Sequence, residues 1–269
     1  TFRDDRTPIN RNNRGFSLTM GTDADHDVNF GAGACWDSTN AFFFSVAAMT
    51  KQFDAIWAAG SAAGGMDVSV SAGFIMAVSD VVHLYAIRKD SDATGDIVAS
   101  LSSNWAGVTQ PSGYTYGRHI GALSTNASRN LRTFVETGGE VNYGVYVNEV
   151  NTAPATSDVL QLLTTVSIPP NARAWGSVRC APDDVAVQVA ACAVTHTRKN
   201  GASVYQHANF YHGTTTAAHF AVGGAMFNVV TDSTQRVSWG GYWTGGSPSN
   251  FVVTVNVLGF ALVDRFAEV

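Results

Sequence analysis

The residues that build long helices are scarce in this chain. Among 269 residues there are ten Leu, four Glu and three Lys. Leu, Glu and Lys are strong helix formers, so their scarcity argues against a bundle of long helices. Only 14% of the residues are charged and the net charge is −5, whereas a general nucleic-acid binder needs clustered Lys and Arg. We therefore expect no nucleic-acid partner.

Long apolar runs and paired cysteines are also missing. No run approaches the ~18 apolar residues of a membrane-spanning helix, so we expect no membrane insertion. The three cysteines, Cys35, Cys180 and Cys192, are odd in number and have no C-x-x-C spacing. This usage excludes a disulfide framework and a zinc site of that spacing. It fits assembly in a reducing cytoplasm, with Cys192 packed in its apolar run as a small hydrophobic side chain.

The chain is rich in short runs of β-branched and aromatic residues, separated by turn residues such as Gly138-Gly139 and Asn200-Gly201. Apolar and polar side chains alternate within several runs, which is typical of antiparallel sheets that cover a shared core. The pattern predicts an all-β fold, an antiparallel β-sandwich or jelly-roll-like body. The clearest runs are residues 66–70, 81–88, 141–147, 185–195 and 252–257.

One segment has the spacing of a helix. In residues 46–59, Met49, Phe53, Ile56 and Trp57 recur at intervals that place them along one side of a helix. The phenylalanines that directly precede the segment favour a strand. The sequence therefore predicts at most one short helix, after a strand at this place.

Residues 1–15 differ from the rest of the chain. They hold four of the sixteen basic residues and show no hydrophobic period. Two interpretations are open: a mobile terminus, or an extended arm that attaches to a neighbouring subunit, since Arg pairs well with carboxylates across interfaces. We assign 1–15 as an attachment arm and 16–269 as one β-sandwich domain. The arginines of this assembly arm are Arg3, Arg6, Arg11 and Arg14.

Acidic residues gather at Asp23, Asp25 and Asp27, with Asp37 ten residues further on. Alternating carboxylates in a loop can converge on a cation, but the calcium-hand pattern fails because a glycine and a glutamate are missing at the required positions. A polar turn whose carboxylates cap their own backbone explains the residues as well. Asp25 and Asp27 could also serve as a glycosidase pair. We assign no metal ligand and no cofactor.

No further motif points to catalysis. The seven histidines form neither an H-E-x-x-H nor an H-x-H pattern. The sequence has no G-x-S-x-G nucleophile elbow, and its glycine-rich pieces match neither a phosphate loop nor a dinucleotide fingerprint. We therefore predict a protein that is not an enzyme and assign no catalytic residue.

Aromatic residues gather again in residues 238–250, where Trp239, Tyr242 and Trp243 stand among four glycines. Exposed rings stack on the C–H faces of sugars, and loop residues commonly carry such binding. The alternative is that these rings pack inside the body or at a subunit contact, because aromatic residues dominate both. We name the three as candidate glycan ligands.

Several segments together resemble a family of tailed-bacteriophage and prophage virion appendage proteins of the tail-fibre type. The likeness covers most of residues 15–135, thins through 136–240 and returns at the C-terminus. The segment around Gly117-Arg118-His119 departs from the family, which usually has two arginines there. The resembling segments are residues 21–30, 33–40, 50–60, 64–67, 83–87, 96–100, 113–121 and 259–265.

The resemblance implies a structural virion protein, a β-rich subunit of a homotrimeric tail fibre or spike that takes part in host-surface attachment. Its expected partners are two further copies of itself, other virion proteins through residues 1–15, and a host polysaccharide. A capsid-attached head fibre or decoration protein is an alternative, and so is a carbohydrate-active enzyme or lectin module. The expected location is the virion.

Overall fold

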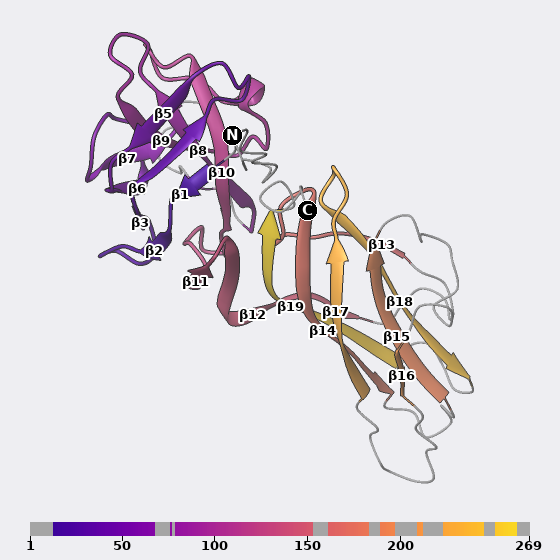
Figure 1. The fold of residues 1–269 in the computed structure, drawn as a ribbon. Helices are drawn as coiled ribbons and strands as arrows, with labels where there is room; N and C mark the ends of the chain where they lie inside the picture. Colours follow the sequence, from indigo (N-terminus) through magenta and orange to yellow (C-terminus); the bar gives the residue numbers. More distant parts are fainter. Residues whose placement is uncertain are drawn as a thin grey trace, which may run out of the picture. The chain divides into compact units, whose positions relative to one another are not determined.

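The computed structural model describes residues 13–67, 76, 79–152, 161–182, 189–196, 209–211, 223–244 and 251–262. In this part of the chain, nineteen strands are joined by loops and by a single turn of 3-10 helix, η1 (Trp105–Gly107) (Figure 1). The prediction of an all-β, sandwich-like fold with at most one short helix is confirmed.

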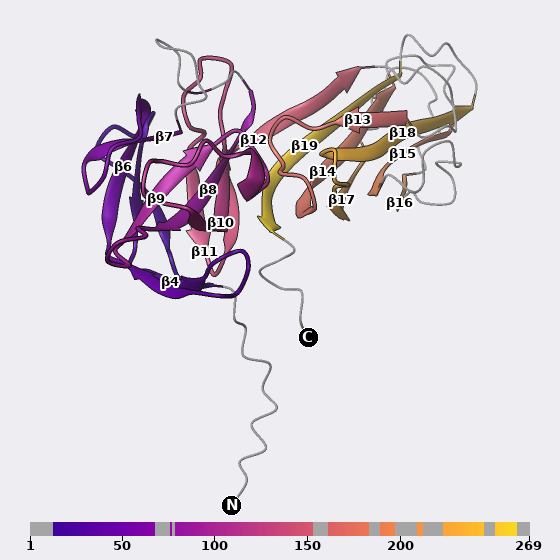
Figure 2. The same ribbon diagram turned by 90° about the horizontal axis from the view of Figure 1, so that it is seen from above.

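The chain divides into two compact units, where the sequence led us to expect one body over 16–269. The first unit contains residues 1–139 together with 262–269, and the second contains residues 140–261. Apart from β11, the strands of each unit form sheets within that unit (Figure 2).

The first unit contains a seven-stranded and a three-stranded sheet. In the larger one, β6–β7 and β7–β9 pair in parallel and the other neighbours are antiparallel. Its order is β10 (Tyr116–Ser124), β8 (Val81–Arg88), β9 (Gly95–Ser100), β7 (Ala63–Met66), β6 (Met49–Ile56), β3 (Asp27–Phe30) and β2 (Leu18–Met20). The smaller sheet has the order β1 (Asn13–Gly15), β4 (Gly33–Trp36) and β5 (Phe43–Val46). The short strand β11 (Phe134–Thr137) lies near β2.

The core of the first unit is built around β8. All residues from Val81 to Ile87 are buried, so both faces of this strand are covered. Tyr85 and Ile87 pack with buried residues of β9 and of the loop that follows it, and Trp57 and Trp105 cover the cluster. Burial on both faces explains why the sequence of β8 is a continuous β-forming run rather than a strict alternation.

The helix predicted over residues 46–59 is wrong. The segment forms the end of β5 and the strand β6, and Lys51 and Phe53 on β6 are both fully buried. Ile56, which the helical stripe placed inside, is 45% exposed. Lys51 and Phe53 stand two positions apart on one buried face of the strand, and a lysine at a buried position hides this period of two from the hydrophobic pattern.

The expected attachment arm falls only partly within the described residues. Asn13–Gly15 form β1, which pairs with β4 from Asn13 opposite Cys35 to Gly15 opposite Gly33. These residues are therefore part of a sheet, and Arg14 is exposed on it. The other arm arginines, Arg3, Arg6 and Arg11, lie outside the described residues.

The second unit has two sheets, whose strands range from three to thirteen residues in length. One contains, in this order, β12 (Glu140–Thr152), β19 (Phe251–Leu262), β14 (Ala172–Pro182) and β17 (Gly223–Val230). The other has the order β13 (Gln161–Thr164), β18 (Arg236–Thr244), β15 (Val189–His196) and β16 (Asn209–Tyr211). Strand β15 lies close to β14 and β17, so the two sheets approach each other there.

Candidate functional site

The best-formed candidate site lies in the first unit, where the ends of two antiparallel strand pairs are brought together. On β4 and β5, Trp36 is opposite Phe43. On β8 and β10, Arg88 is opposite Tyr116. The turn that joins β4 to β5 lies beside the start of β10, where the Ser38 N–H donates to the carbonyl oxygen of Gly117.

This turn is organised by Asp37, whose side chain is buried. One carboxylate oxygen accepts the backbone N–H groups of Ala41 and Phe42 at 2.7 and 2.8 Å. The other oxygen accepts the N–H of Thr39 at 3.2 Å and also the Thr39 hydroxyl. Burial works to raise the pKa of Asp37, but these hydrogen bonds outweigh it and hold the pKa below its ordinary value.

The side chain of Arg118 on β10 holds the turn in place through hydrogen bonds. Its Nε donates to the carbonyl oxygen of Trp36 at 2.7 Å, and its Nη2 donates to the carbonyl oxygen of Asp37 and to Oδ1 of Asn40. The backbone N–H of Ser38 adds a hydrogen bond of 2.9 Å to β10. A short turn held from both sides in this way presents its side chains with little conformational freedom.

Phe42, Arg88 and Tyr116 form the surface feature that we call the aromatic patch. The ring centroids of Phe42 and Tyr116 are 4.5 Å apart, and the Arg88 guanidinium carbon lies 4.9 and 5.7 Å from the same two centroids. Phe42 is 38% exposed. The next residue, Phe43, is 56% exposed and pairs with Trp36 at 5.6 Å. Exposed rings and a cation on a fixed turn are suited to non-covalent binding.

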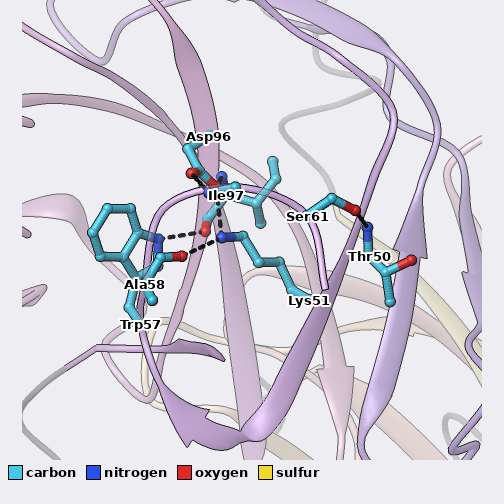
Figure 3. Close-up of polar contacts among 8 residues, drawn as sticks. Thr50, Lys51, Trp57, Ala58, Ser61, Asp96 and Ile97 are labelled. Carbon is cyan, nitrogen blue, oxygen red and sulfur yellow. Dashed lines mark hydrogen bonds and ion pairs between the residues drawn. The ribbon is translucent and has the colours of Figure 1, made fainter. Parts of the chain in front are cut away.

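A second polar cluster in the same unit is buried (Figure 3). The Lys51 ammonium forms an ion pair of 2.7 Å with Asp96, and their side chains are 0% and 4% exposed. It also donates to the carbonyl oxygen of Ala58 at 2.8 Å and lies 5.3 Å from the centre of the Trp57 ring. Burial lowers the pKa of Lys51, and Asp96 opposes that shift.

The buried pair holds the segment that joins β6 to β7. Asp96 accepts the N–H of Gly60 at 2.8 Å and that of Ile97 at 2.6 Å. The Trp57 indole N–H donates to the carbonyl oxygen of Ile97 at 2.8 Å. Because these groups satisfy one another inside the unit, we assign the cluster to structure rather than to ligand binding.

The acidic segment predicted as a polar turn or a cation site has features of both. Asp23 accepts the N–H of Asp25 at 3.1 Å and pairs with Nδ1 of His26 at 2.9 Å. The hydrogen bond from His26 is the main cause of the lowered pKa of Asp23. Asp23, His26 and Asp54 each offer a ligand atom within 4.8 Å of the others, so these three could hold a small cation. Asp25 and Asp27 are not among them, and Asp37 organises the separate turn described above.

Two histidines are paired inside the first unit. Nδ1 of His83 on β8 lies 3.1 Å from Nε2 of His119 on β10, and the His119 ring is 5.1 Å from that of Tyr85. Burial lowers the pKa of His83 to about 4, so this ring is neutral at physiological pH. This placement agrees with a structural histidine.

The predicted glycan residues lie in the second unit, and they are not on a loop as expected. All three belong to strand β18, and Trp239 is only 5% exposed. A buried ring has no open face for a sugar, so the packing alternative applies to Trp239. The side chains of Tyr242 and Trp243 lie outside the described residues.

Sequence reasoning missed the aromatic patch because its members are far apart in the chain. The available signal was local: Asp37-Ser38-Thr39-Asn40, a run of turn residues, stands one residue before the three phenylalanines at 42–44. Such a run indicates a chain reversal. The partners Arg88 and Tyr116 become visible only when β8 and β10 are paired.

No model of a known protein family matches this chain, and a search of curated proteins finds no similar sequence. Within the described residues, no helix has the length and apolar character needed to cross a bilayer.

Proposed function

We propose that this chain is a structural virion protein of a tailed phage or phage-like particle, a subunit of a homotrimeric tail fibre or spike. In this proposal it attaches the particle to host-surface polysaccharide and catalyses no reaction. The resemblance of residues 15–135 to virion appendage proteins is its starting point, and that stretch falls within the first unit.

The observation that carries the proposal is that the resembling segments hold one another in place. Residues 113–121 contact residues 33–40 through Arg118. Residues 50–60 contact residues 96–100 through the ion pair of Lys51 with Asp96. These resembling segments therefore belong to one folded unit of this chain, which is the arrangement that the proposal expects of a virion appendage module.

The aromatic patch supports the attachment role. It lies on the same unit, and the Asp37 turn and Arg118 hold it rigidly without any additional ligand. Binding residues carried on loops over a rigid scaffold are the usual arrangement of recognition proteins.

Exposed apolar side chains on edge strands of the second unit support self-association. Met226 and Val230 on β17 are 61% and 42% exposed, and Leu162 on β13 is 42% exposed. Both strands stand at one end of their sheets. Association of three copies would cover such edges and apolar side chains.

Peptide mass spectrometry of purified particles from a host strain that encodes this chain tests the virion assignment. We expect its peptides to sediment with the particles and to remain after washing in high salt. Recovery only in the soluble fraction, with other virion proteins intact in the pellet, would overturn the proposal.

Native mass spectrometry of the purified full-length chain tests the trimer. We expect three copies, and we expect Met226→Lys to reduce the trimer fraction because it places a charge among the apolar edge residues. Val135→Lys is the matched control, since Val135 is 62% exposed but belongs to the first unit. A wild-type chain that remains a monomer contradicts this part of the proposal.

A further inference from the structure

We propose that the aromatic patch binds an acidic glycan, with Arg88 contacting a sugar carboxylate and Phe42 stacking on the neighbouring sugar face. This inference rests on the proposed attachment function and deepens it by naming the site and the ligand class.

Arg88 supplies the positive charge of the aromatic patch. In the described part of the chain, no carboxylate lies within ion-pair distance of its guanidinium. Its contacts are the rings of Phe42 and Tyr116 at 4.9 and 5.7 Å. A cation–π contact uses none of the five N–H donors of an arginine, so these donors remain available. The neighbouring Lys89 differs, because it forms an ion pair of 3.0 Å with Asp92.

Arg88 and the ring beside it suit a ligand that carries a carboxylate next to an apolar face. Guanidinium groups bind carboxylates in a bidentate, charge-assisted manner, which supplies both strength and orientation. The exposed ring of Phe42 beside the cation is suited to the apolar face of a sugar. A ligand that carries a carboxylate next to a C–H face satisfies both features, and a uronic-acid residue of an acidic polysaccharide is such a ligand.

The turn that carries Phe42 also offers hydrogen-bonding groups. Ser38 and Asn40 are exposed. The side-chain oxygen of Asn40 accepts a hydrogen bond from Arg118. In the described structure, neither the side-chain nitrogen of Asn40 nor the Ser38 hydroxyl has a partner. These groups can bind sugar hydroxyls. The acidic groups nearest in sequence are already engaged, since Asp37 binds turn amides and Asp90 accepts from Thr115.

The turn that carries the aromatic patch is already fixed in the free protein. Asp37 fixes the backbone N–H of Phe42, and Arg118 fixes the carbonyl groups of the turn. Because these contacts restrict the turn in the free protein, little ordering cost remains for the complex. A weak ligand such as a short saccharide therefore gains measurable affinity.

The test is isothermal titration calorimetry of the full chain with a short oligogalacturonate and with its carboxyl-reduced, neutral counterpart. We expect binding of the acidic probe that weakens with added salt, and binding of the neutral probe at least about tenfold weaker. Arg88→Gln should lower the affinity for the acidic probe by about tenfold to a hundredfold, because one charge-assisted contact is lost. Arg88→Lys keeps the charge without the planar fork and should give an intermediate value.

Phe42→Ala should lower the affinity for both probes, because it removes the stacking face. Lys89→Gln and Ile56→Ala are the matched controls: the first removes a neighbouring paired charge and the second an exposed apolar side chain, 45% exposed, of the same unit. Both should bind like the wild type, and all variants should keep its circular dichroism spectrum and melting temperature.

Equal affinity for the acidic and neutral probes, or an Arg88→Gln variant that binds like the wild type, overturns the proposal. So does a Phe42→Ala variant that loses its trimeric state while glycan binding is unchanged, since the patch is then a subunit contact. Presence of the chain in particles without glycan binding rejects this inference alone. Glycan binding by a chain that is absent from particles rejects the virion assignment alone.

Discussion

Lys51 and Asp96 form a buried ion pair, and replacing one or the other should destabilise the first unit by different amounts. After Lys51→Met, Asp96 still accepts the N–H groups of Gly60 and Ile97, so its charge remains partly satisfied. After Asp96→Ala, the Lys51 ammonium keeps only the carbonyl oxygen of Ala58 and the Trp57 ring, and two backbone N–H groups lose their acceptor.

The expected loss in the free energy of unfolding follows from this difference. Removal of one partner of a buried ion pair costs about 3–5 kcal/mol, and an orphaned buried donor such as the Ile97 N–H costs about 1–3 kcal/mol, whereas Gly60 is exposed and its N–H can bind water. We expect Lys51→Met to cost about 3 kcal/mol and Asp96→Ala about 5 kcal/mol. The double variant Lys51→Met/Asp96→Ala should cost less than Asp96→Ala alone, because it leaves no unpaired buried charge.

The assay is hydrogen exchange at increasing urea, followed by mass spectrometry of peptides that cover residues 49–67. Resolution by peptide assigns the free energy of unfolding to the first unit and separates it from the second. A cost of about 1 kcal/mol or less for Asp96→Ala would show that the pair is solvated and would refute the reasoning. A double variant whose cost equals the sum of the single ones would do the same.

Three further outcomes concern other residues of the first unit. Burial lowers the pKa of His83 to about 4, so between that value and its unfolded pKa of about 6.5 the unfolded state binds more protons. Stability should therefore fall by up to about 3 kcal/mol as the pH drops through this window, and urea titrations of His83→Gln should show a flatter dependence. Burial raises the pKa of Cys35 to about 12, so iodoacetamide at neutral pH should label its peptide only after unfolding. Gly64→Ala should lower the melting temperature far more than Gly60→Ala, because its Cβ would lie 1.9 Å from the Ile56 carbonyl oxygen, whereas the one at Gly60 meets open space and only the strain of φ +95°.

The sequence was most informative where a strand buries one regular face. The run at 252–257 lies within β19, and Val253, Val255 and Val257 are all buried as the alternation predicts. In the run at 141–147, Val141 and Val147 are buried but Val145 is 74% exposed. The register of β12 against β19 shifts between residues 142 and 147, and such a bulge turns the side chains to the other face.

The sequence was least informative where burial contradicts residue type or where partners are distant. Lys51 is inside because Asp96, 45 positions away, neutralises it, and no local pattern indicates that pairing. Trp239 was taken for a loop residue because of the surrounding glycines, yet β18 continues through Gly240 and Gly241. The aromatic patch needs the register of two strand pairs, which composition and spacing do not supply.

The most direct measurement of the central proposal is a competition assay for adsorption. Purified full-length chain is added to host cells before the particles, and the unadsorbed particles are counted. The proposal predicts that wild-type chain blocks adsorption in a saturable manner and that Arg88→Gln blocks it poorly. Unchanged adsorption at a saturating concentration of the wild-type chain would contradict the attachment function.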